Sequence, residues 1–253
     1  TIMYICKKIT MRVRLFVLCC LLCSVVVSST AQQTTINCKL ADVYVSQQTN
    51  KFGLYVTAID TLLQRKYSDE LLFTRMKVRH IYIAHLLFYD SKSPHIATHL
   101  REFKRDIDTL ETIEKYAKEI TAFKSTYAAY TAAQRPALAI YYLPRSFSLA
   151  KEAIRLLPES PYSWAEYGNL EYCYALFINK NFNTAIKAFS KAIYLFETQK
   201  LASSCNWYYL NTLLFLAKSY EDNKQYADAN KIYDKILAIR PDYQAIHRWK
   251  HSL

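Results

Sequence analysis

The chain has 253 residues, of which 52% are hydrophobic, and its 33 Lys and Arg against 21 Asp and Glu give a formal net charge of +12. It contains only two glycines, Gly53 and Gly168, whereas glycine-rich phosphate loops, dinucleotide-binding turns and tight β-hairpins need glycine where the backbone adopts a positive φ. The composition therefore argues against those folds and their chemistry, and the high apolar content argues against a disordered chain. A helical protein needs little glycine, so we expect an all-α fold.

The first 31 residues predict a secretory signal peptide. We expect translation to start at Met11, which opens a basic stretch, and the apolar run over residues 15–27 that follows is shorter than the ~20 residues of a spanning helix. Ser29 and Ala31 place small residues at the −3 and −1 positions of a cut after Ala31. We therefore expect residues 1–31 to be removed and the protein to be exported, periplasmic or secreted, with no transmembrane domain left. An uncleaved anchor is the alternative.

Cleavage at this point would leave three cysteines, Cys38, Cys173 and Cys205. An odd number in an exported protein allows one disulfide and leaves one thiol over. Two alternatives remain open. Either all three thiols are unpaired and pack as small apolar side chains, or Cys173 and Cys205, which the sequence places on neighbouring helices, form a bridge.

The first well-marked helix begins near residue 69. Ser68 provides a capping side chain, acidic residues follow in the first turn, and apolar residues continue with helical spacing to Leu87. His80 lies on this apolar stripe, so we expect a partly buried core histidine. Residues 90–93 break the pattern.

A second apolar stripe runs from residue 94 to Ile120 with spacings of three and four. It predicts one amphipathic helix of about seven turns. A stretch rich in Ala and Tyr follows and ends at Pro144. We place a boundary there, which divides the mature chain into an N-terminal helical region, 32–145, and a C-terminal region, 146–253.

The C-terminal region repeats a pattern of large and small residues. Its last part places Leu213, Leu216, Ala217, Tyr220, Tyr226, Ala229, Tyr233, Ile236 and Pro241 at fixed spacings. This pattern resembles the tetratricopeptide repeat, a 34-residue pair of helices. Trp164 and Gly168 begin an earlier unit in the same way, and Ala150 to Pro158 fits the end of another.

The middle unit is longer than the repeat. Trp164 and Ala185 are 21 residues apart where 16 are expected, and Ala185 and Leu213 are 28 apart where 18 are expected. We expect the additional residues to form longer helices or a longer loop.

The resemblance implies antiparallel helix pairs stacked as a right-handed solenoid, with the N-terminal region as degenerate units or as a cap. It also implies a non-catalytic scaffold that binds a protein or peptide in a concave groove. The groove positions of the family correspond to Tyr162, Ala165, Asn169, Tyr172 and Cys173 in one unit and to Asn211, Leu214, Lys218, Glu221 and Asp222 in the last. A structural or self-assembling subunit of an envelope complex is the alternative function.

The sequence lacks the common catalytic and metal-binding motifs. No HExxH, P-loop, G-x-S-x-G or paired-cysteine zinc spacing occurs, and His95 and His99 lie on one helix face without an evident third ligand. Basic and acidic residues are interleaved, with no run of five like charges. We expect no enzyme, no metal, no cofactor and no nucleic-acid partner. An enzyme or sugar-binding protein built on the N-terminal helices would need a convergent set of acid–base groups, which the sequence does not indicate.

Overall fold

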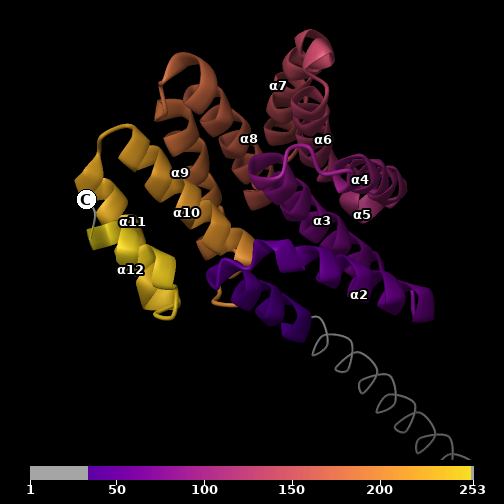
Figure 1. Cartoon of the computed structure of the whole chain (residues 1–253), viewed down its shortest axis with the longest axis horizontal. Helices are drawn as coiled ribbons and strands as arrows, with labels where there is room; N and C mark the ends of the chain where they lie inside the picture. Colours follow the sequence, from indigo (N-terminus) through magenta and orange to yellow (C-terminus); the bar gives the residue numbers. More distant parts are fainter. Residues whose placement is uncertain (1–33, 252–253) are drawn as a thin grey trace, which may run out of the picture.

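The computed structural model describes residues 34–251, and every regular element in that range is a helix (Figure 1). The expected all-α class is therefore confirmed, and helices that are neighbours in the sequence pack in contact. The predicted signal segment, residues 1–31, lies outside the described range. Within that range no helix combines the length and the apolar character needed to cross a membrane.

A helix over residues 34–45 comes first. The elements after it are η1 (Thr49–Lys51), α2 (Phe52–Arg65), α3 (Asp69–Tyr89), α4 (His95–Glu111), α5 (Glu114–Ala117), α6 (Ile120–Gln134), η2 (Pro136–Leu138), α7 (Ala139–Leu156), α8 (Pro161–Tyr174), the π-helical turn η3 (Ala175–Asn179), α9 (Asn183–Thr198), α10 (Trp207–Asp222), α11 (Tyr226–Ile239) and α12 (Gln244–His251).

Helix α3 begins where the sequence predicts. The Ser68 hydroxyl accepts a hydrogen bond from the backbone N–H of Leu71 at 3.4 Å, which satisfies one of the free donors of the first turn. The helix ends at Tyr89, before the predicted break. His80 is buried, with 5% of its surface exposed, as its place on the apolar stripe indicates.

The single helix predicted from residue 94 to Ile120 is wrong. Helix α4 ends at Glu111, α5 is one short turn, and α6 then packs against α4. The reversal buries Tyr116 of α5, whose ring stacks on Phe73 of α3 with centroids 4.8 Å apart. The apolar stripe misleads because α4 and α6 bury their apolar sides in one core, so the spacing continues across the turn.

The boundary placed at Pro144 falls inside a helix, because α7 runs through this residue. Proline removes one backbone donor, but Pro144 and Ile140 are both exposed, so water can reach the carbonyl that loses its partner. Deeper in the protein α7 pairs with α6 through two small residues. The Ser125 hydroxyl donates to the backbone carbonyl of Ser146 at 2.9 Å, and the Ser146 hydroxyl donates to that of Ser125 at 3.0 Å.

Helices α8 and α9 pack against each other, as do α10 and α11. The additional residues of the middle unit take both expected forms. The turn η3 prolongs α8, and residues 199–206 form a loop between α9 and α10. Several repeat positions of the last unit are fully buried, among them Ala217, Ala229 and Tyr233, whereas Tyr226 is 47% exposed.

Gly168 allows α8 and α9 to approach closely. A Cβ atom at this position would lie 2.7 Å from Cδ1 and Cε1 of Phe189, whose ring is completely buried. We expect Gly168→Ala to lower the free energy of unfolding by about 1–2 kcal/mol, because the cost of overpacking exceeds the gain of about 1 kcal/mol in helix propensity. Urea unfolding followed by circular dichroism measures this difference. A stabilised variant would show that Phe189 moves aside freely.

The two ends of the described chain meet. A disulfide joins Cys38, in the 34–45 helix, to Cys205, in the loop before α10, so neither alternative from the sequence is correct. Cys173 is free and exposed. Arg240 also forms an ion pair with Asp42 at 2.9 Å, across 198 residues of sequence.

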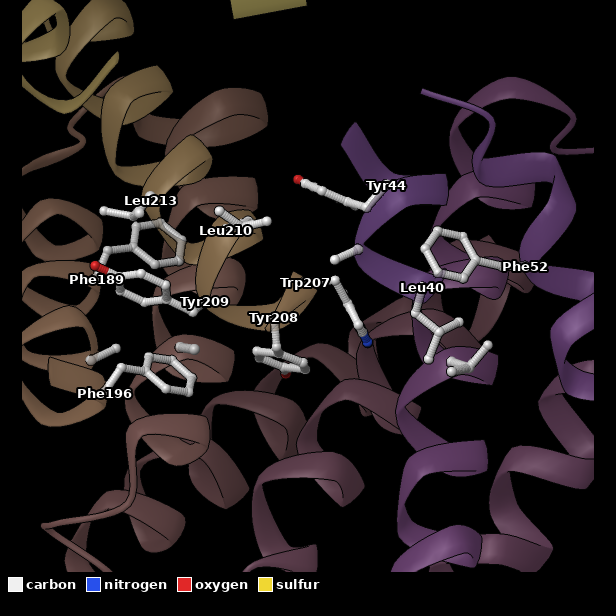
Figure 2. Packing of buried hydrophobic residues seen from close by; sticks show 14 of the residues in the cluster. Leu40, Tyr44, Phe52, Phe189, Phe196, Trp207, Tyr208, Tyr209, Leu210 and Leu213 are labelled. Carbon is white, nitrogen blue, oxygen red and sulfur yellow. The ribbon is translucent and has the colours of Figure 1, made fainter. Parts of the chain in front are cut away.

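Apolar contacts reinforce this closure. The Trp207 ring, at the start of α10, lies beside the rings of Tyr44 and Phe52, with centroids 6.4 and 5.8 Å apart (Figure 2). Leu40 and Phe52 are completely buried. The first helix of the described chain is thus part of the same core as α10.

Candidate functional site

The groove residues predicted on α8 lie beside the N-terminal helices. The Tyr162 ring contacts the ring of Phe73 on α3 edge-on, with centroids 5.9 Å apart, and the Lys77 ammonium lies 4.7 Å from its centroid. Ala165 is 1% exposed. Side chains of α3 therefore lie against Tyr162, which an open array of repeats would leave free for a ligand.

The outer end of α8 is partly open. Asn169 is half-buried, and its amide donates to Glu166 at 3.0 Å. Tyr172 is 9% exposed, and its hydroxyl donates to the Asp222 carboxylate on α10 at 2.8 Å. Burial raises the pKa of Tyr172 above its ordinary value, as does this carboxylate, so the phenol remains a donor that holds α8 to α10.

The predicted residues on α10 fall into two groups. Asn211 is buried, and its side-chain oxygen accepts a hydrogen bond from the Tyr44 hydroxyl at 2.9 Å. Leu214, Lys218 and Glu221 are half-buried. The Lys218 ammonium pairs with Glu221 at 2.9 Å and lies 5.1 Å from the ring centroid of Trp249 on α12. The predicted positions Cys173 and Asp222 are exposed. We call the four half-buried residues, Asn169, Leu214, Lys218 and Glu221, the α8–α10 face.

Sequence reasoning missed a buried polar cluster that joins four helices. Glu166 of α8, 2% exposed, accepts hydrogen bonds from Thr126 of α6 and Tyr208 of α10. Its carboxylate also lies 3.4 Å from Nε2 of His80 on α3. The Tyr130 hydroxyl of α6 is 2.7 Å from the other ring nitrogen of His80. We call these five residues the Glu166 cluster.

The electrostatics of the cluster favour a charged carboxylate. Burial by itself raises the pKa of Glu166, but the attraction of His80 and the hydrogen bonds from His80, Thr126 and Tyr208 outweigh it, so this pKa lies below its ordinary value. Burial and the nearby carboxylate raise the pKa of Tyr208 and of Tyr130 well above the ordinary value, so both phenols stay protonated. The cluster holds acid and base groups together, but burial closes it to substrate.

A second buried ionic network fastens α2 and α4 to α3. Asp106 of α4, 1% exposed, accepts hydrogen bonds from Arg75 and Arg79 of α3. Arg75 also donates to Asp60 of α2 at 2.6 Å. Burial raises the pKa of Asp106 although the two guanidinium groups oppose it. This network fixes the N-terminal helices that cover α8.

His95 and His99, the pair with metal-like spacing, have different surroundings. His95 is exposed at the start of α4, whereas the His99 ring meets Tyr82 of α3 edge-on with centroids 4.9 Å apart. Within the described range, no group of three or more metal-ligating side chains gathers at one point.

The chain matches no protein-family model and no curated protein. The candidate site therefore depends on the contacts described above and on the sequence pattern.

Proposed function

We propose that the chain is an exported, non-catalytic scaffold of stacked helix pairs of the tetratricopeptide type, which binds a protein or peptide at its α8–α10 face. The observation that supports this proposal most directly is the fit of Gly168 against Phe189, because a small residue facing an aromatic ring is what the repeat requires at these positions. The buried small residues of α10 and α11 support the same register. A right-handed solenoid is the arrangement that this register implies.

The disulfide supports export. Disulfides persist in oxidising compartments outside the cytoplasm. The Cys38–Cys205 bond joins the 34–45 helix to the loop before α10, so it links distant parts of the fold. The burial of the Glu166 cluster supports a non-catalytic role, because its acid and base groups have no access to a substrate.

The binding proposal limits where a ligand lies. Since side chains of α3 lie against Tyr162 and Ala165 is buried, a ligand would reach the outer end of α8 and the middle of α10, around Asn169, Leu214 and Lys218. A half-buried leucine beside a lysine–glutamate pair offers apolar contact flanked by both charges, which suits a short peptide or a helix of a partner.

Substitution of Leu214 tests the proposed face. We expect Leu214→Glu to reduce retention of a partner from envelope extract at least tenfold, because a charge placed inside an interface without a counterpart costs several kcal/mol. The immobilised full chain is incubated with extract, and retained proteins are identified by mass spectrometry.

The matched control is Leu54→Glu, at a residue of α2 that is 68% exposed and distant from the face. It should retain the same proteins as the natural chain. Failure of the natural chain to retain any protein over several salt concentrations would contradict the proposal, as would equal retention by Leu214→Glu.

A further inference from the structure

Two neighbouring hairpins end in exposed apolar side chains at one edge of the molecule, the top in Figure 1. Ile140, just after the connection from α6 to α7, is 87% exposed, and Phe177, in the turn from α8 to α9, is 72% exposed. The apolar residues exposed at these tips are Leu138, Ile140, Tyr141, Leu143, Tyr174, Phe177 and Ile178. We call this set the tip surface.

The two tips belong to one surface. Phe147 of α7 meets Tyr174 of α8 edge-on, with ring centroids 5.4 Å apart. Leu143 precedes Phe147 by four residues and so lies about 6 Å nearer the tip of α7. Phe177 follows Tyr174 by three residues on a helix that runs toward the same edge (Figure 1). The exposed apolar residues of both tips therefore lie on the same side of the Phe147–Tyr174 contact.

The charge around the tip surface has one sign. Residues 134–147 and 172–183, which include both tips, contain Arg135, Arg145 and Lys180 and no Asp or Glu. Arg135, Arg145 and Lys180 are exposed and take part in none of the ion pairs found among the described residues. Such a surface attracts anions and also has apolar side chains to bury.

We infer that the tip surface docks onto a lipid bilayer that contains anionic phospholipids. Aliphatic and aromatic side chains at the tips would enter the boundary between headgroups and acyl chains, while the basic residues meet the phosphate groups. A second copy of the chain is a poorer occupant, because a two-fold contact pairs the same patch on both copies and would bring their basic residues together without acids to neutralise them. The tip surface and the α8–α10 face share no residue, so substitutions can test this inference separately from the proposed function.

The tip between α10 and α11 is more polar than these two, although Tyr226 beside it is 47% exposed. The connection from α10 to α11 is formed by Asn223, Lys224 and Gln225. This connection carries no leucine, isoleucine or phenylalanine. We therefore expect the α6–α7 and α8–α9 tips, and not this one, to enter the bilayer.

Vesicle binding tests the inference. The full chain is sedimented with vesicles of phosphatidylcholine that contain 30% phosphatidylglycerol, and with vesicles of phosphatidylcholine alone. We expect binding at least tenfold stronger to the anionic vesicles, weakening with salt. Ile140→Ser with Phe177→Ser should reduce binding at least tenfold, and Arg135→Gln with Arg145→Gln several-fold. Both pairs alter exposed side chains, so they leave the core intact.

Matched controls carry the same kinds of change on α2 and at the residue that follows it. Leu54→Ser controls for the loss of exposed apolar surface, and Arg65→Gln with Lys66→Gln controls for charge; each should bind within twofold of the natural chain. Every variant has the same N-terminal segment, so a difference between tip and control variants comes from the tips. Hydrogen exchange in the presence of vesicles should show protection over residues 135–147 and 174–183.

Several results would overturn the inference. They are equal binding to neutral vesicles, tip variants that bind like the controls, and protection confined to other segments. A dimer that Ile140→Ser with Phe177→Ser dissociates in light scattering would assign the surface to a second copy. Absence of vesicle binding, with an acidic protein bound by the natural chain and lost in the tip variants, would assign it to that protein.

Discussion

Replacement of Glu166 by Ala is expected to lower the free energy of unfolding by about 3–5 kcal/mol, the usual effect of removing one partner from a buried ionic or hydrogen-bonded set. The substitution removes the acceptor shared by Thr126 and Tyr208 and leaves a cavity beside His80. Since these groups come from four helices, the loss affects the contact of α8 with α3, α6 and α10 together. Urea unfolding of the natural and variant chains measures the difference.

Glu152→Ala is the matched control, because Glu152 is exposed on α7. Its effect should stay within about 0.5 kcal/mol, as for most surface substitutions. Glu166→Gln keeps the size of the side chain but loses its charge, so it should lie between the two. If Glu166→Ala cost less than about 1 kcal/mol, the carboxylate would not hold the four helices together.

The pH dependence of the free energy of unfolding, compared between the natural chain and Glu166→Ala, gives a second readout. The pKa of Glu166 in the folded protein lies below its ordinary value, so the folded state binds fewer protons than the unfolded state. The stabilisation is fully present above the unfolded pKa, about 4.3, and is lost as the pH falls through the folded pKa. The difference between the natural chain and Glu166→Ala should therefore shrink below about pH 4.

The sequence predicts the features that depend on near neighbours. Ser68 is a cap because its partner is the backbone N–H of Leu71, and Gly168 is small because the adjacent helix brings Phe189 against it. In both cases the decisive contact lies within one helix or one helix pair. The prediction of one helix from residue 94 to Ile120 is wrong because the apolar spacing reflects burial in a core that two helices, α4 and α6, share.

The features that were missed depend on residues far apart in the chain. The partners of Glu166 come from other helices, 40 residues away in the case of Thr126 and 42 in that of Tyr208. The one available signal in the sequence was Glu166 itself, an acid among small and aromatic residues of α8, and it does not reveal the partners. The same limit applies to the candidate site, where the repeat pattern gave the positions on α8 but not their coverage by Phe73 and Lys77 of α3.

Removal of the disulfide by Cys38→Ser with Cys205→Ser is expected to lower the free energy of unfolding by about 5 kcal/mol. The two cysteines are 167 residues apart, so the bond restricts most of the described chain in the unfolded state, and chain entropy gives this magnitude for so long a loop. Chemical denaturation of the natural chain and the variant measures the loss, and treatment of the natural chain with dithiothreitol should reproduce it.

The control is Cys173→Ser, which removes the exposed thiol and should change stability by less than about 0.5 kcal/mol. Thiol titration of the unfolded chain should show that Cys38 and Cys205 are unreactive before reduction. Equal destabilisation by Cys173→Ser would contradict the observed connectivity.

A separate variant tests how much noncovalent contacts contribute to the attachment of the 34–45 helix to the C-terminal helices. Tyr44→Phe removes the hydrogen bond to Asn211 but keeps the ring beside Trp207, so it should cost only about 1–2 kcal/mol while the disulfide is present. In the chain without the disulfide the same change should increase hydrogen exchange of the 34–45 helix, because its attachment then depends on apolar burial, including that of Leu40 and the Tyr44 ring, and on the Arg240–Asp42 pair. Full protection of that helix in the combined variant would mean that apolar burial, without the covalent bond, is enough to join the two ends of the fold.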